Sequence, residues 1–343
     1  MNGTKIHVAA GTYAHGSETF PLCIKDISGL QLLGESRDNT IINAGGSAKR
    51  ILIITNAPST RIEGFTLCGG YVVSASSALY GGGLYINNCS GLVISDCLIT
   101  NNHLQSTLNH GQAYGGGLFI TGGAVTLRKC IISYNKAYSY GDFNTDSGKG
   151  EGICALGTLI IDSCVISDNL ADNVYKRVGL GAGIYANGVI DARNTLLHRN
   201  MSLQYGDAVY VGGGIFRMEN CTVADHATDG IYKSGGTVST TNSILWNNGD
   251  DIVGSSVLLG YSCVEDGDNN GTNGCIMANP LFENASTANY RIKPLSPCRD
   301  SAIWKTWMAG AEDLDGKPRV VGNKPDMGCY ESQYRAGSVF MVK

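Results

Sequence analysis

The stretch that decides the fold is GGGLYINNCSGLVISDCLITNN, residues 81–102, because the chain repeats its pattern five more times. Each copy opens with a glycine-led segment such as GGGLYI, and later versions of that segment start at residues 115, 150, 181, 206 and 228. The second segment, LVISDCLITNN in the first copy, restarts at residues 125, 159, 190, 216 and 238. A weaker version, RIEGFTLCGG, stands earlier at 61–70. Self-similarity of this period indicates a solenoid in which each coil packs on its neighbours.

The second segment predicts two short strands with a bend between them. Its first, third and eighth positions are apolar, its sixth is small, and its eleventh is usually Asn. Alternation of this kind turns every second side chain toward the core, and stacked strands lie about 4.8 Å apart. We therefore predict an all-β, right-handed parallel β-helix, with coils over residues 1–260 and the final coils and a C-terminal cap over 261–343. Because the strand pattern starts almost at Met1, we expect an N-terminal cap to lie upstream.

Two columns of side chains follow from stacking equivalent positions. We interpret the first as small buried groups that fill the same gap in each coil, since parallel Cβ vectors suit disulfides poorly and no ligands stand at metal spacing. We interpret the second as amides that bond to their stacked neighbours. The first column contains Cys97, Cys130, Cys164 and Cys221, with Phe65, Thr195 and Ser243; the second contains Asn102, Asn135, Asn169, Asn200 and Asn248, with His226.

A third column should point outward from the glycine-led strand. Its members are Tyr85, Phe119, Cys154, Tyr185, Tyr210 and Tyr232. Two interpretations stay open. The rings could support each other by cross-strand packing, or they could form a platform for sugar rings. Under the second interpretation Tyr85, Phe119, Tyr185, Tyr210 and Tyr232 bind substrate.

The segment between the Asn turn and the next glycine-led strand is long in the early coils and short later. Long loops stacked beside an aromatic strand would wall a groove, and loops carry function on rigid scaffolds. Hydrolysis needs two carboxylates, whereas elimination from a uronic acid needs a base and charge neutralisation. Neither set has a diagnostic spacing, so the presence of an enzyme activity stays open. The candidates are His110, Tyr138 and Tyr140 for binding; Asp142, Asp146 and Glu151 for hydrolysis; and Lys149, Lys176 and Arg177 for elimination.

Composition excludes several classes of partner. Charged residues make up 16% of the chain and its net charge is −4, which argues against nucleic acid and anionic membrane surfaces. No run approaches the roughly 18 apolar residues of a membrane span.

Two C-terminal stretches carry a resemblance to a known family. NPLFENASTANYRIKPLSPCRDSA (279–302) and DLDGKPRVVGNKPDMGCYE (313–331) closely resemble the end of bacterial right-handed β-helix proteins of the choice-of-anchor Q type. The resemblance implies a pectate-lyase-like solenoid that is secreted or displayed on the cell surface. It does not imply one activity, because relatives include polysaccharide-degrading and adhesive proteins. The chain ends at SQYRAGSVFMVK, without the family's apolar anchoring tail.

The cap raises two further expectations. Cys298 and Cys329 stand where that family more often has a small residue, and we predict that they form a disulfide; Cys263 and Cys275 should close a second, shorter loop. Calcium is a candidate cofactor through oxygen ligands, although a role in turns and capping is favoured. These candidate ligands are Asp313, Asp315, Asp326 and Glu331.

Two functional hypotheses result. The first is an extracellular or surface β-helix that binds, and in a catalytic version cleaves, a uronate-type polysaccharide along the aromatic groove. The second is a non-catalytic adhesin or structural surface protein that self-associates.

Overall fold

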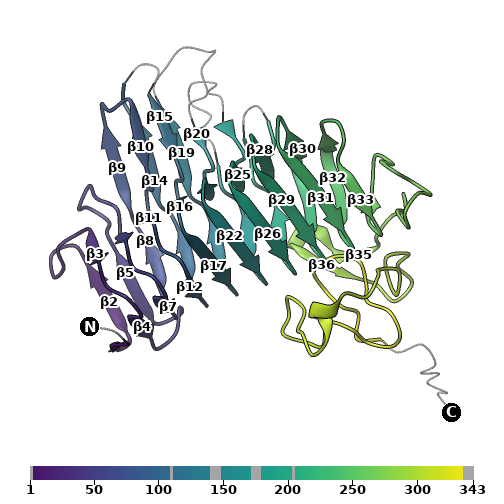
Figure 1. The fold of residues 1–343 in the computed structure, drawn as a ribbon, viewed down its shortest axis with the longest axis horizontal. Coiled ribbons are helices and arrows are strands. Elements are labelled where there is room, and N and C mark those ends of the chain that lie inside the picture. Colours follow the sequence, from purple (N-terminus) through teal and green to yellow (C-terminus); the bar gives the residue numbers. More distant parts are fainter. Residues whose placement is uncertain (1–2, 109–110, 140–147, 171–178, 203–204, 335–343) are drawn as a thin grey trace.

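The computed structural model describes residues 3–108, 111–139, 148–170, 179–202 and 205–334. Within them the chain is almost entirely β, and nearly every strand pairs in parallel with the equivalent strand one coil away. The coils stack along the long axis of the molecule (Figure 1). The predicted right-handed parallel β-helix is confirmed. No helix in the described part of the chain is long and apolar enough to cross a membrane.

One side of the coils, which we call the first face, is a ten-stranded sheet. Its strands begin the second segment of each repeat, and alternate residues such as Leu159 and Ile161 are buried while Ile160 is exposed. The strands are β1 (Lys5–Val8), β4 (Gln31–Gly34), β7 (Arg61–Glu63), β12 (Leu92–Ser95), β17 (Ala124–Arg128), β22 (Thr158–Asp162), β26 (Val189–Arg193), β29 (Ile215–Glu219), β31 (Thr237–Thr241) and β33 (Leu258–Gly260).

The second and third faces are joined into one sheet because β30 (Thr222–Lys233) and β32 (Ile244–Val253) run through both. The second face otherwise contains β2 (Gly11–Ala14), β5 (Thr40–Asn43), β8 (Thr66–Cys68), β13 (Leu98–Thr100), β18 (Ile131–Ser133), β23 (Val165–Ser167), β27 (Leu196–His198) and β34 (Cys263–Val264). The third face contains β3 (Leu22–Lys25), β6 (Leu52–Thr55), β11 (Leu84–Asn87), β16 (Leu118–Thr121), β21 (Ile153–Ala155), β25 (Ile184–Ala186) and β28 (Val209–Val211).

Two further small sheets occupy the region where the sequence predicted long loops. They pack on each other around a core of Leu79, Leu104, Ala113 and Ala137, so the early coils are widened by a layered extension. One sheet contains β9 (Tyr71–Ser74), β14 (His103–Ser106) and β19 (Lys136–Ser139), and the other contains β10 (Ala78–Tyr80), β15 (Gln112–Tyr114), β20 (Gly148–Lys149) and β24 (Gly179–Leu180).

Both predicted inward columns are present. The column cysteines Cys97, Cys130, Cys164 and Cys221 are at most 1% exposed and belong to the main core. In the amide column, Asn135 Nδ2 donates to Asn169 Oδ1 at 3.0 Å, and Asn169 Nδ2 donates to Asn200 Oδ1 at 2.9 Å. The stack continues through His226 Nε2 and Nδ1 to Asn248 Oδ1. Each amide thus satisfies the next one in the absence of water.

The cap, residues 265–334, contains β35 (Phe282–Asn284), β36 (Asn289–Ile292) and the 3₁₀ turns η2 (Ala285–Thr287) and η3 (Thr306–Met308). We expected it to cover the open end of the last coil. It also folds back along the side of the coils, drawn in yellow in Figure 1. Three left-handed turn residues between the first and second faces hold it there. Asn194, Asn220 and Asn242 donate their Nδ2 groups to the carbonyls of Glu312, Asp326 and Ile303 at 2.9, 3.0 and 2.8 Å.

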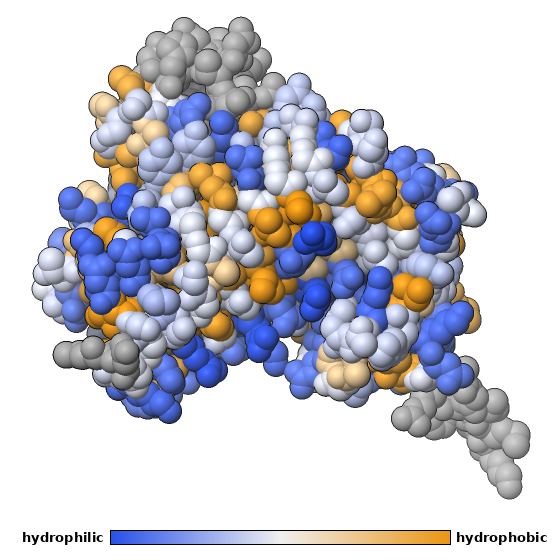
Figure 2. All heavy atoms as spheres, viewed as in Figure 1, coloured by the Kyte–Doolittle hydropathy of each residue, from blue (hydrophilic) through white to orange (hydrophobic). Residues whose placement is uncertain are grey.

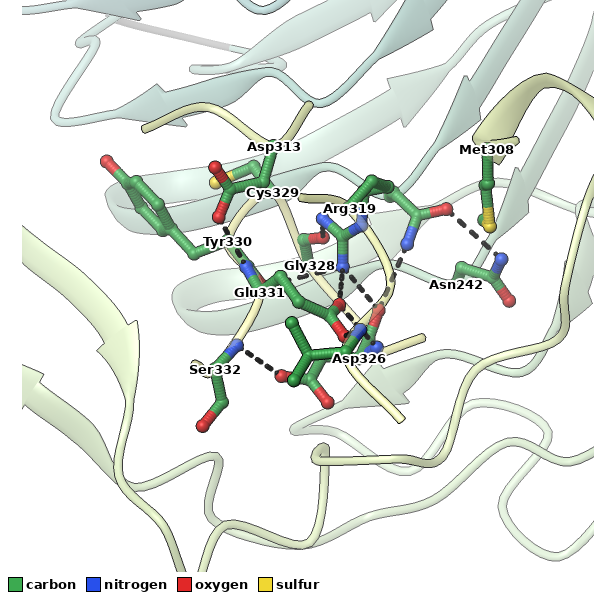
Figure 3. Close-up of polar contacts among 12 residues, drawn as sticks. Asn242, Met308, Asp313, Arg319, Asp326, Gly328, Cys329, Tyr330, Glu331 and Ser332 are labelled. Atoms are coloured by element: carbon green, nitrogen blue, oxygen red, sulfur yellow. Dashed lines mark hydrogen bonds and ion pairs between the residues drawn. The ribbon is translucent and has the colours of Figure 1, made fainter. Parts of the chain in front are cut away.

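A buried ion pair stabilises the cap (Figure 3). Arg319 is fully buried, pairs with Glu331 at 2.8 Å, and donates to the carbonyls of Gly328 and Asp326. Burial raises the pKa of Glu331 to about 7, and the Arg319 charge opposes this rise. Removing one member would leave the other buried without a counter-charge, so the pair joins two parts of the cap that are 12 residues apart in the chain.

The four candidate calcium ligands form hydrogen bonds or ion pairs with other groups of the protein. Asp313 accepts the N–H of Glu331 at 2.8 Å, Asp326 accepts the N–H groups of Asp300 and Ser332, and Asp315 pairs with Arg291. These contacts are of the kind expected for a turn-and-cap role, and a calcium ion at these residues stays a prediction. Among the described residues, no cluster of three or more His, Cys, Asp or Glu side chains is arranged to hold a metal ion.

The two predicted disulfides are wrong, since all four cysteines are free thiols. The fold separates the predicted partners. Cys298 packs in one small cluster, where its thiol contacts that of Cys263, whereas Cys329 packs in another and donates to Thr222 Oγ1 at 3.3 Å. Cys275 belongs to the main core.

Candidate functional site

A sharp bend joins the small sheet of β10, β15, β20 and β24 to the third face, and glycine makes this bend possible. Gly81, Gly115, Gly150, Gly181 and Gly206 all have φ between 64° and 74°. A Cβ at Gly150 would lie 2.1 Å from the carbonyl oxygen of Ile153. Only glycine adopts this backbone so close to another chain segment. The bend places the residue before each glycine near the outward residue of the third face, in most pairs that of the next coil, which creates two neighbouring columns, here called the aromatic edge.

The column on the third face is the one predicted from the sequence. Tyr185, Tyr210 and Tyr232 stack with ring centroids 5.5 and 5.4 Å apart and interplanar angles of 8° and 4°. Tyr85 and Phe119 stack at 5.7 Å. The rings therefore support each other along the solenoid, and their edges and hydroxyl groups, rather than their faces, turn outward.

The second column stands on the other side of the glycine bend and packs onto the first. Tyr80 lies 4.7 Å from Phe119, and Tyr205 lies 4.5 Å from Tyr232, measured between ring centroids. The coil between these pairs carries Lys149, whose Nζ is 5.3 Å from the centre of the Tyr114 ring and 5.7 Å from that of Tyr185. A cation held between aromatic rings is attracted to the negative ring faces.

The expectation that Phe119 offers a ring to a ligand is wrong. Phe119 is only 3% exposed because Tyr80, Tyr85 and Tyr114 pack around it. Tyr80 and Tyr205 are 37% and 38% exposed and take the outer position instead.

Glu151 lies one residue beyond the glycine of the same coil as Lys149, and it is fully buried. Neither of its carboxyl oxygens has a hydrogen-bond partner in another described residue. Burial raises the pKa of Glu151 to about 8, and the negative charge of Asp207, two coils along, raises it further. The group is a neutral carboxylic acid near pH 7, a protonation state that catalytic acids also use.

The other sequence-predicted residues separate into two groups. Tyr138 lies on β19 in the other small sheet, where its hydroxyl donates to Gln105 Oε1 at 3.0 Å, so it does not belong to the aromatic edge. The remaining candidates lie outside the described residues; they are His110, Tyr140, Asp142, Asp146, Lys176 and Arg177.

Sequence reasoning missed Tyr80 and Tyr205 as members of the site. A signal was present, because ALYGGG, QAYGGG and LQYGDA each place Tyr directly before the bend glycine. The column only becomes visible once that glycine is known to be a bend, since a continuous strand would send these side chains elsewhere.

Comparisons with known proteins give the fold. No family model matches the chain, and no curated protein matches it by sequence. A solved structure of pectate lyase Pel9A is similar with a TM-score of 0.62 and 12% identity, over 96% of this chain and 88% of that one. At this identity the similarity shows the fold alone. Membership of the choice-of-anchor Q type, suggested by the C-terminal stretches, stays a prediction. The chain itself is a right-handed parallel β-helix.

Proposed function

We propose that this protein is an extracellular or cell-surface β-helix that binds an acidic polysaccharide along the aromatic edge. The observation that carries the proposal is the stack of Tyr185, Tyr210 and Tyr232 in register over three coils, with Tyr205 packed on it and the Lys149 cation near the Tyr185 ring. The similarity to the pectate lyase structure is consistent with a polysaccharide ligand, because the name of that enzyme refers to pectate, which is a polysaccharide.

The edge suits a linear polymer because its contacts repeat once per coil, at about 4.8 Å. Tyrosine hydroxyls can exchange hydrogen bonds with sugar hydroxyls, and the ring edges can pack against sugar C–H groups. Since neighbouring rings cover each other's faces, the polymer would run across the ring edges rather than lie on one flat ring.

Cations on the same edge favour an acidic polymer. Lys149 lies over Tyr114 and Tyr185, and the guanidinium of Arg50 lies 5.5 Å from the centre of the Tyr85 ring. These groups can pair with the carboxylates of uronate residues, and such pairs weaken as salt is added.

The described residues support binding better than cleavage. Of the six catalytic candidates, Lys149 and Glu151 are described, and the Glu151 carboxyl is fully buried beneath the edge. A catalytic acid must reach the bond that it protonates. The competing hypothesis is a non-catalytic adhesin or structural surface protein that self-associates.

A polymer panel tests the proposal. Polygalacturonate, alginate, xylan and a neutral glucan are compared by affinity electrophoresis and calorimetry, with wild-type protein and a Tyr210→Ala/Tyr232→Ala variant. We expect the acidic polymers to bind and the variant to lose about 10-fold or more in affinity. The matched control is Tyr134→Asn, which removes an exposed tyrosine at a left-handed turn where Asn101 and Asn247 stand in other coils.

Two results would overturn the proposal. One is wild-type protein that binds none of the polymers, and the other is an unchanged affinity in the double variant. Concentration-dependent assembly in sedimentation, unaffected by Tyr185→Ala and Tyr210→Ala, would favour the structural hypothesis instead.

A further inference from the structure

A crevice of about 370 Å³ lies between the cap and the turns that join the first and second faces. We call it the cap crevice. The coils contribute Arg128, Lys129, Asp162, Ser163, Arg193 and Asn194, and the cap contributes Trp307, Gly310, Ala311 and Glu312. Its size is in the range of small-ligand sites. Hydrophilic side chains flank the line along which the cap meets the coils (Figure 2).

Arg128 and Arg193 occupy equivalent positions two coils apart, with Asp162 between them. The Nε atom of Arg128 lies 3.3 Å from Asp162, and that of Arg193 lies 3.6 Å from Glu219. Both side chains are about half exposed, and no hydrogen bond to another described residue uses their terminal Nη atoms. Two guanidinium ends are thus available for an oxyanion, which arginine binds with paired hydrogen bonds.

The amide of Asn194 supplies a second, independent observation. Asn194, Asn220 and Asn242 all donate to carbonyls of the cap. Asn220 Oδ1 accepts from Asn242 Nδ2 at 3.1 Å, and Asn242 Oδ1 accepts the N–H of Ile303 at 2.9 Å. Asn194 is 2% exposed, and its Oδ1 atom accepts no hydrogen bond from any described residue. A buried acceptor without a donor is costly, and a ligand hydroxyl at this wall would supply one.

Trp307 gives the crevice a fixed aromatic wall. Its Nε1 donates to Glu219 Oε2 at 2.7 Å, and the Arg193 guanidinium lies 5.4 Å from the ring centre. Because the ring is held by both contacts, it can pack against the C–H groups of a sugar ring at small conformational cost.

We propose that the cap crevice binds one acidic sugar residue. Its carboxylate or sulfate pairs with Arg128 and Arg193, one hydroxyl donates to Asn194 Oδ1, and the sugar ring packs against Trp307. The lining carries three cationic and two acidic side chains on a chain whose net charge is −4, which favours an anion. The crevice lies on other faces of the coils than the aromatic edge, so this inference does not require the proposed function.

Tryptophan fluorescence and calorimetry test the inference, with trigalacturonate, a sulfated disaccharide, a neutral trisaccharide and inorganic sulfate as probes. We expect at least one acidic sugar to bind and to weaken as salt is added. Arg128→Gln should weaken binding about 10-fold to 100-fold, and Arg193→Gln by a similar factor. No hydrogen bond or ion pair joins Arg128 to a described residue of the cap, so its replacement should leave the cap attached.

Arg217→Gln is the matched control. Arg217 projects from the same first face, is about half exposed like Arg128, and pairs with Asp191 at 3.0 Å outside the crevice. Its replacement should leave the affinity unchanged.

The inference fails if neither acidic sugar binds wild-type protein, if Arg128→Gln binds as wild type does, or if inorganic sulfate binds as tightly as the sugars, which would mean an adventitious ion only. If wild-type protein binds an acidic sugar in the crevice but binds no polymer at the aromatic edge, the proposed function is contradicted and this inference is not.

Discussion

Replacing Glu151 with glutamine should change how the stability of this protein depends on pH. The Glu151 carboxyl is fully buried, and within the part of the chain that the structure describes its oxygens have no hydrogen-bond partner in another residue. Burial raises its pKa from 4.5 to about 8, and the negative charge of Asp207 acts in the same direction. Glutamine has nearly the same shape and stays neutral at every pH, so the variant isolates the effect of ionisation.

The sign of this pH dependence follows from whether the folded or the unfolded chain holds the proton of Glu151. Below pH 4.5 the carboxyl is protonated in both the folded and the unfolded chain, and the group does not oppose folding by ionising. Between pH 4.5 and 8 the unfolded chain releases the proton while the folded chain keeps it, so the free energy of unfolding decreases as the pH rises. At pH 7 this effect amounts to about 3 kcal/mol.

The assay is denaturant unfolding at pH 4.5, 7 and 8, followed by tryptophan fluorescence. We expect the wild-type and Glu151→Gln proteins to differ least at pH 4.5, and the variant to gain about 3 kcal/mol relative to wild type by pH 7. Glu283→Gln, at an exposed carboxylate, is the control and should follow wild type. Infrared spectra of the wild type at pH 7 should contain a protonated carboxyl band that the variant lacks. Parallel pH profiles together with no such band would refute the reasoning.

Three other substitutions test the ladder, the cap and a second titration. Asn169→Ala removes the acceptor of Asn135 Nδ2 and should lower the free energy of unfolding by about 3 kcal/mol, measured by denaturation against an exposed Asn56→Ala. Arg319→Ala leaves Glu331 buried without its partner and should cost about 3–5 kcal/mol, with the cap becoming the first region to exchange amide hydrogens. Burial lowers the pKa of His198 from 6.5 to about 4, so its neutral form stabilises the fold above pH 6.5 and that contribution, about 3 kcal/mol, is lost as pH falls toward 4. His198→Gln should remove this acid-side loss, and an unchanged slope of stability between pH 6.5 and 4 would contradict the assignment.

The repeat made the fold predictable. Six copies with alternating apolar residues determine which side chains face the core, and stacking at a constant spacing converts equivalent positions into columns. The buried column at Cys97, Cys130 and Cys164 and the amide ladder through Asn135 and Asn169 therefore lie as predicted. These features depend on local spacing within one coil and on contact with the next coil, which a repeat encodes directly.

The predictions that were wrong concern contacts that do not recur from one coil to the next. Phe119 was expected to be open, but it is covered by Tyr80 and Tyr114, because the bend at Gly115 sets a second column against the first. The predicted disulfide between Cys298 and Cys329 failed because the irregular chain of the cap places the two thiols in separate clusters. The repeated sequence of the coils therefore gives no information about this packing.

By itself the sequence determined the solenoid, the core-facing side chains of its coils and the columns that stack in register, because these follow from periodicity. Only the tertiary structure decided that the aromatic rings cover each other's faces, that Glu151 is buried without a hydrogen-bond partner among the described residues, and that the cap returns to close a crevice over Arg128 and Arg193. Those features arise where segments far apart in the chain meet, and the side chains that meet there have no spacing in the sequence that marks them as neighbours.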